Sequence, residues 1–118
     1  MRIRILIVDN EPRWIEFVKR DLDKFEIVVA HNMEETLDEL TKDRFDLIIA
    51  SSKNLDVLQA ITEKFADKRV VVTTIHPSTD EALHVYRLGA VRYFPKSFGQ
   101  RDLLNRVQDV IPMNRLYA

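Results

Sequence analysis

Five short runs of apolar, mostly β-branched residues alternate with amphipathic segments along this chain of 118 residues. Runs of four to eight such residues are too short for helices. Their nearly continuous apolar character is typical of strands that are buried on both faces of a parallel sheet. The runs that predict strands are Ile3–Val8, Glu26–Ala30, Asp46–Ala50, Arg69–Thr74 and Val91–Phe94.

The segments between these runs carry helix signals. Pro12 marks a helix start, since its missing N–H is not needed in the first turn. Asn32 reads as an N-cap with Glu35 placed for a capping box. Gly89 ends a helix that Ser78 or Thr79 caps, and Pro112 closes the last one. Apart from the helix that ends at Gly89, the helical patterns cover residues 12–22, 33–43, 55–65 and 100–111.

Strict alternation of strands and helices predicts an α/β fold. We expect a doubly wound, five-stranded parallel sheet with five helices, the flavodoxin-like (βα)5 arrangement. No linker or low-complexity segment interrupts it, so we expect one domain over residues 1–112 and a short tail over 113–118.

Composition narrows the function classes. A net charge of −1 offers no field for nucleic acid or an anionic membrane, so we expect neither as a direct partner. The absence of cysteine excludes thiolate catalysis and cysteine-based metal sites. No stretch approaches the roughly 20 apolar residues of a membrane span. The chain has only two glycines, and they form no phosphate-binding loop of the nucleotide-binding kind. We expect a cytoplasmic location.

In a sheet of this kind, ligands bind beyond the carboxyl ends of the strands. The residues that follow the strands therefore form the candidate site. They are Asp9, Asn10 and Glu11 after the first strand, Ser51 after the third, Thr74 at the end of the fourth and Lys96 after the fifth.

Four separate segments resemble the receiver domain family of response regulators (CheY-like), over essentially the whole chain. ILIVDNEP (5–12) resembles the first-strand signature of that family, and FDLIIAS (45–51) resembles its third strand running into the phosphoacceptor. VVVTT (70–74) ends at the family's hydroxyl position, and LGAVRYFPKSF (88–98) resembles the stretch with its switch aromatic and lysine. The resemblance implies a role in two-component phosphorelay signalling.

In that family a carboxylate accepts a phosphoryl group, an acidic pair holds Mg²⁺, and a hydroxyl and a lysine contact the phosphoryl oxygens. By the resemblance, Thr74 is the hydroxyl, Lys96 the lysine and Tyr93 the switch aromatic. Asp9 keeps the first acidic position, while Asn10 occupies the second.

By the resemblance, Ser51 holds the acceptor position, which implies a degenerate, pseudo-receiver site. A serine cannot form an acyl phosphate, and its hydroxyl is a poor nucleophile without a base. Mg²⁺ favours hard anionic oxygens, and two formal charges are missing from the cluster. We therefore expect no cofactor and at most weak Mg²⁺ binding at Asp9, with Glu11 as a further relic acid.

Simpler structural roles are also predicted at the same positions. Ser51 is expected to hydrogen-bond within the strand end, and Asp9 to form an ion pair with Lys96. Residues 51–58 are shorter than the matching family loop and are expected to drop a turn. Because Ser97 follows Lys96, a trans bond is expected there. Trp14 is expected to be half-buried at the pocket rim.

The resemblance also implies a partner surface formed by the fourth helix, the fifth strand and the fifth helix. Tyrosines interleaved with arginines have the composition of interface anchors, although ordinary exposed side chains would look the same. This face would include Tyr93, Tyr86, His84, Arg87, Arg101, Asn105 and Gln108. The expected partner is a signalling protein, and the chain is expected to be a monomer or weak homodimer.

These observations predict a non-enzymatic receiver domain that acts through protein–protein interaction and is not phosphorylated on aspartate. One alternative is a signalling switch with unconventional phosphorylation at Asp9 or Ser51. Another is a small-molecule-sensing or hydrolytic α/β domain that uses Ser51 and Lys96, because a Ser–Lys pair is a known nucleophile arrangement.

Overall fold

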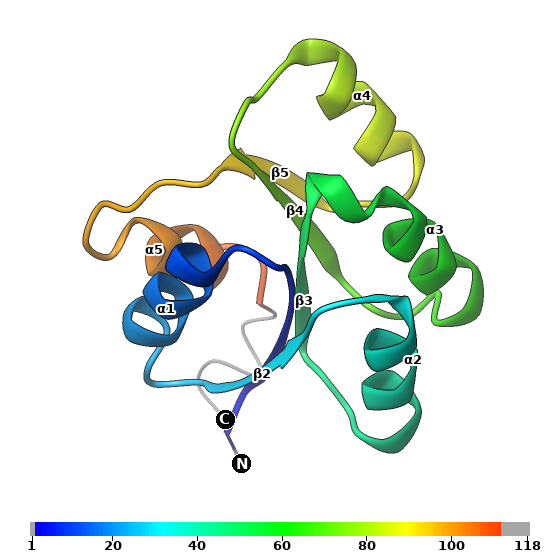
Figure 1. Ribbon diagram of the computed structural model, residues 1–118, viewed down its shortest axis with the longest axis horizontal. Coiled ribbons are helices and arrows are strands. Elements are labelled where there is room, and N and C mark those ends of the chain that lie inside the picture. Colours follow the sequence, from blue (N-terminus) through cyan, green and yellow to red (C-terminus); the bar gives the residue numbers. More distant parts are fainter. Residues whose placement is uncertain (1, 112–118) are drawn as a thin grey trace.

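The structure is a computed structural model, and it describes residues 2–111. Five strands and five α-helices alternate along the chain, with one 3₁₀ turn, η1, after the third strand (Figure 1). The strands are β1 (Arg4–Val8), β2 (Glu26–Ala30), β3 (Leu47–Ser51), β4 (Val70–Thr74) and β5 (Arg92–Pro95). The helices are α1 (Pro12–Asp21), α2 (Met33–Lys42), η1 (Ser52–Asn54), α3 (Leu55–Lys64), α4 (Thr79–Arg87) and α5 (Asp102–Gln108).

All strand pairs are parallel, and the order across the sheet is β2-β1-β3-β4-β5. Helices α1 and α5 cover one face, while α2, α3 and α4 cover the other (Figure 1). The predicted doubly wound sheet is therefore confirmed, and each predicted strand begins within one residue of the observed one.

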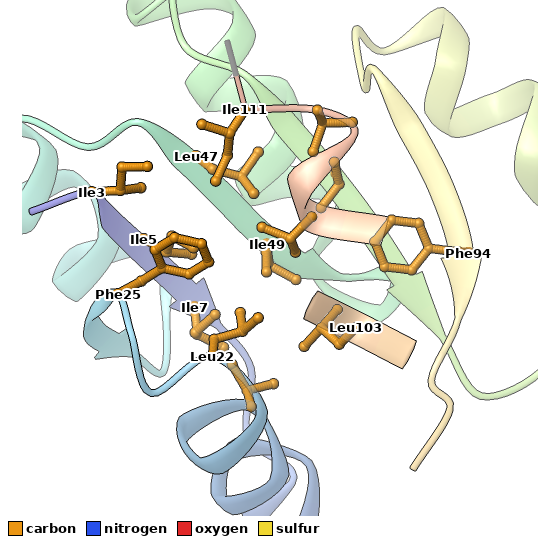
Figure 2. Close-up of a cluster of buried hydrophobic side chains, with 14 of the residues drawn as sticks. Ile3, Ile5, Ile7, Leu22, Phe25, Leu47, Ile49, Phe94, Leu103 and Ile111 are labelled. Carbon is orange, nitrogen blue, oxygen red and sulfur yellow. The ribbon is translucent and has the colours of Figure 1, made fainter. Parts of the chain in front are cut away.

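Successive strand side chains enter opposite layers of the core. Ile5 and Ile7 of β1 join Leu47 and Ile49 of β3 beneath α1 and α5, as Figure 2 shows. Leu6 of β1, with its β3 partner at residue 48, packs beneath the other three helices. This alternation explains why the strands are apolar almost throughout, since both faces are covered.

The predicted helix signals are found in the structure. Pro12 is the first residue of α1. Asn32 caps α2 by accepting the Glu35 N–H at 2.8 Å, and the Glu35 carboxylate accepts the His31 N–H at 3.0 Å. Ser78 caps α4, and Gly89 follows that helix with a φ of 108°. None of the described helices is long and apolar enough to cross a membrane.

The end of α5 differs from the prediction. The helix stops at Gln108 rather than continuing to residue 111. Val110 and Ile111 instead hydrogen-bond back to the Val107 carbonyl and are buried in the α1–α5 layer. The predicted stop at Pro112 and the tail over 113–118 lie outside the described residues.

The start of α5 is capped from another helix. Its own N-cap residue, Arg101, has a left-handed φ of 69° and provides no side-chain cap. Asp21, the last residue of α1, accepts the Arg101 N–H at 2.7 Å and the Leu104 N–H at 2.9 Å, one on each carboxylate oxygen. One carboxylate therefore ties the end of α1 to the start of α5.

Replacing this carboxylate should loosen α5. We expect Asp21→Ala to lower the free energy of unfolding by about 1–2 kcal/mol, because it leaves two N–H groups at a helix start without their charged acceptor. Urea unfolding followed by circular dichroism measures this change. Asp23→Ala, an exposed aspartate two residues away, is the matched control and should change little. Equal effects of the two variants would contradict the capping role.

Candidate functional site

The carboxyl ends of four strands meet at one edge of the sheet. There the structure gathers Asp9 from the end of β1, Ser51 from β3, Thr74 from β4 and Lys96 from the residue after β5. Two adjoining hollows lie over them, with volumes of about 270 and 250 Å³. The sequence-predicted residues are therefore neighbours in space.

Lys96 is the centre of the charged part of this site. Its ammonium lies 2.9 Å from Asp9 Oδ2 and 2.8 Å from Glu11 Oε2. The Lys96 and Asp9 side chains are only 4% and 5% exposed, and that of Glu11 is 33% exposed. The Trp14 ring lies 5.7 Å from the same nitrogen. The predicted ion pair between Asp9 and Lys96 is present, and Glu11 joins it.

One oxygen of the Asp9 carboxylate, Oδ1, accepts hydrogen bonds from the backbone. Asp9 Oδ1 accepts the N–H groups of Asn10 at 2.8 Å and Glu11 at 3.0 Å. These bonds fix the carboxylate so that its other oxygen faces Lys96. The Asn10 side chain is exposed, and no group of three or more His, Asp or Glu residues in 2–111 is arranged to hold a metal ion.

Ser51 has the structural role expected of a strand-end hydroxyl. It is buried, and its Oγ accepts the Lys53 N–H at 3.2 Å, which caps η1. Strand β3 thus runs directly into η1, and α3 begins at Leu55. No peptide bond of the described chain is cis, as expected for the bond after Lys96.

Thr74 makes contacts that the sequence did not predict. Its buried hydroxyl accepts hydrogen bonds from Ser52 Oγ at 3.2 Å and from the His76 N–H at 3.3 Å. Ser52 carried no motif signal, because a serine after a strand is ordinary in turns.

Tyr93 is held by the start of α4. Its hydroxyl donates to Glu81 Oε1 at 2.6 Å and accepts the Ser78 N–H at 3.1 Å, while its ring packs against the core layer of α2, α3 and α4. Burial and, next, the hydrogen bond to Glu81 raise the pKa of the Tyr93 phenol. Tyr93, which was predicted as an interface anchor, is therefore a partly buried, hydrogen-bonded side chain.

Trp14 is more buried than predicted. It is 1% exposed because Phe17 stacks on it at 5.4 Å and Phe98, from the loop after β5, covers it edge-on at 5.5 Å between ring centroids. Phe98 and Phe17 also line a cleft of about 460 Å³ between α1 and the start of α5.

The residues predicted for a partner surface differ in exposure and surroundings. His84, Tyr86 and Arg87 are exposed on α4, and Tyr86 is 46% exposed. Arg101 lies beside Asp21 and lines the cleft with Phe17, and its place in a partner surface with Tyr93 stays a prediction.

On α5, Asn105 is exposed and Gln108 is half-buried. Arg106 of α5 contacts β5, because its guanidinium lies 5.3 Å from the centre of the Phe94 ring. No sequence signal marks Arg106, because which flank of α5 meets β5 depends on how that helix sits on the sheet.

Comparison with known proteins agrees with this architecture. The model of the response regulator receiver domain family matches residues 5–108. The transcriptional regulatory protein CpxR of Escherichia coli K12 is 30% identical over 115 residues, which cover 92% of this chain and 49% of CpxR. The chain spans about half the length of the curated relatives it matches.

Solved structures give the same result. A response regulator from Thermotoga maritima superposes with a TM-score of 0.86 at 27% identity, over 94% of this chain and 98% of that one. The non-phosphorylated receiver domain of HemR from Leptospira biflexa superposes with a TM-score of 0.83 at 26% identity, over 95% and 96% of the two chains. Fold, strand-end residues and sequence together show that the chain belongs to the response regulator receiver domain family of two-component signalling.

Proposed function

We propose that this chain is a phosphorylation-independent receiver domain, which acts as a protein-interaction module in signalling. The observation that carries the proposal is the paired state of Lys96. Its ammonium is neutralised by Asp9 and Glu11, while the acceptor position holds a neutral serine. The charged groups at this site thus satisfy one another.

The Ser51 hydroxyl is a poor substitute for an aspartate carboxylate as the group that accepts phosphoryl. Phosphoryl transfer to aspartate uses a carboxylate that is already ionised, whereas a serine needs a base to take its proton. Ser51 Oγ instead accepts a backbone N–H from Lys53. This contact supports a structural role for Ser51 and gives it no base.

The donor set does not fit a resident Mg²⁺. Mg²⁺ prefers several hard oxygen ligands in octahedral geometry, usually including carboxylates. Here Asp9 Oδ1 already accepts two backbone N–H groups, and Asp9 Oδ2 and Glu11 Oε2 both contact the ammonium. A divalent cation would have to displace Lys96 from a buried pair, so we expect Mg²⁺ binding to be absent or weak.

The test is exposure of the purified chain to Mg²⁺ and acetyl phosphate. We expect no gain of a phosphoryl group in the intact mass and no magnesium-dependent change in Trp14 fluorescence. Trp14 is a suitable reporter because its ring lies near the Lys96 ammonium. A phosphoryl adduct mapped to Ser51 or Asp9 would instead identify a working switch with an unconventional acceptor and overturn the proposal.

The partner surface is expected on α4 and the adjoining edge strand β5. Leu83 and Tyr86 are large exposed apolar side chains on α4, with His84 and Arg87 beside them. Exposed tyrosine and arginine are enriched in protein interfaces. Because Tyr93 is held by Glu81, the partner would meet a surface of fixed shape.

A further inference from the structure

The cleft of about 460 Å³ between α1 and the start of α5 lies apart from the site at the strand ends. Helices α1 and α5 lie side by side, with the loop between β5 and α5 next to them (Figure 1). None of Asp9, Ser51, Thr74 and Lys96 lines this cleft. Its volume falls within the range of pockets that hold small molecules in proteins, roughly 300–1,000 Å³.

Two phenylalanine rings and a leucine form the apolar part of the cleft. Phe17 of α1 is buried, whereas Phe98 of the loop is 52% exposed. Their ring centroids are 5.4 Å apart, and the rings meet at an angle of 61°. Leu104 of α5 is half-buried and lines the same cleft. A flat aromatic group suits this surface, because aromatic rings pack well against the faces and edges of other rings.

The polar part of the cleft carries two arginines with unused donors. The Arg20 and Arg101 side chains are exposed there and make no ion pair or hydrogen bond with another residue of 2–111. Asp21 does not pair with them, because its two carboxylate oxygens accept backbone N–H groups. Asp23 is exposed at the cleft and forms no ion pair with either arginine. The cleft therefore offers two guanidinium groups to an anion.

The backbone at Arg101 favours a role for its side chain. Among residues 2–111, Arg101 is the one residue other than glycine with a positive φ, at 69°. A Cβ atom destabilises this left-handed conformation, which glycine adopts freely, and Asp21 holds it through the Arg101 N–H at 2.7 Å. Non-glycine residues in such conformations cluster at functional sites, where the surrounding structure holds them. Arginine at this position gives the cleft a side chain that glycine would not.

We propose that the cleft binds a small aromatic carboxylate. The ring of the ligand packs against Phe17 and Phe98, and its carboxylate accepts hydrogen bonds from the guanidinium groups of Arg20 and Arg101. Arginine suits this role because its planar donors match the two oxygens of a carboxylate. The inference goes beyond the proposed function and does not depend on it.

Titration of the ¹⁵N-labelled chain with 2-naphthoate, followed by NMR, tests this proposal. We expect saturable shifts of the amides of residues 98–104, with a Kd of about 1 mM or below, the range of a fragment-sized ligand. The indole N–H of Trp14, the only tryptophan of the chain, should shift too, because Phe17 and Phe98 pack on its ring. 2-Naphthamide has the same rings without the charge, and it should bind at least about 10-fold more weakly.

Variants of the two arginines separate a binding role from a structural one. Arg101→Gly and Arg20→Gln should each weaken the binding of 2-naphthoate by about 10-fold. Arg101→Gly also relieves the left-handed backbone, so its Tm should stay the same or rise while the affinity falls. Arg13→Gln is the matched control for Arg20→Gln, because Arg13 is an exposed arginine of the same helix outside the cleft. It should leave the affinity unchanged.

Several results would overturn the proposal. They are the absence of saturable shifts up to the solubility limit of 2-naphthoate, equal affinity for 2-naphthamide, and full affinity in both Arg101→Gly and Arg20→Gln. Shifts centred on residues 51–54 and 74–76 would also overturn it, because they would place the anion at the strand ends. The acetyl phosphate experiment concerns that other site, so a phosphoryl adduct would end the proposed function and leave this inference standing.

Discussion

The double variant Asn10→Asp/Ser51→Asp should gain magnesium-dependent phosphorylation by acetyl phosphate. The fold and the retained residues Thr74 and Lys96 already stand at the correct strand ends, so two carboxylates supply the missing charge. The carboxylate introduced at position 51 attacks phosphorus, the bond from phosphorus to the acetyl oxygen breaks, and acetate leaves. We expect labelling at least about 10²–10³-fold faster than in the natural chain, the size of effect that preorganised charge has on such steps.

Intact mass spectrometry with and without Mg²⁺ measures this gain. Asn10→Asp/Ser51→Asn is the matched control, because it restores the acidic pair but provides an amide in place of the nucleophile. The variant Ser51→Asp alone should label more slowly, since Asn10 leaves the cation with one ligand fewer. If the double variant folds and binds Mg²⁺ but takes up no phosphoryl group, residues other than 10 and 51 prevent phosphorylation.

Removing the charge of Lys96 should give the largest loss of stability. We expect Lys96→Met to lower the free energy of unfolding by about 3 kcal/mol, because breaking a buried pair by deleting one partner leaves uncompensated charge. Asp9 cannot turn to water, since two backbone N–H groups hold its other oxygen. Glu11 is more exposed and can relax, which keeps the expected loss at the lower end of the range for buried pairs.

Thermal and urea unfolding of Lys96→Met and Lys53→Met test this expectation. Lys53 lies at the same site but is exposed and makes no ion pair with another described residue, so its replacement should change stability little. Equal free energies of unfolding for the two variants near neutral pH would show that the Lys96 ion pairs make no net contribution to stability.

Local signals define the elements of this fold. The apolar runs predicted the five strands, and Pro12, Asn32 and Ser78 predicted the starts of three helices. These signals act within a few residues of one another, so they need no knowledge of the rest of the chain. The pairing of Asp9 with Lys96 was also predictable, because parallel strands bring their carboxyl ends to one edge.

Contacts between elements follow from packing and were not predictable. Asp21 caps a helix whose N-cap residue lies 80 residues later, and Phe98 covers Trp14 from a loop after the last strand. No local pattern encodes such pairs, because they depend on how α1, α5 and the loop before it sit on the sheet.

The hydrogen bonds around the site follow the same rule. Ser52 and Glu81 are ordinary residues for a turn and a helix start, and only the folded chain brings Ser52 to Thr74 and Glu81 to Tyr93. Residue patterns alone were enough to predict the strands, the helices and the edge of the sheet where the site lies. The hydrogen-bond partners of its side chains became known only from the folded chain, because such bonds depend on distances within a few tenths of an ångström that no pattern of residue types specifies.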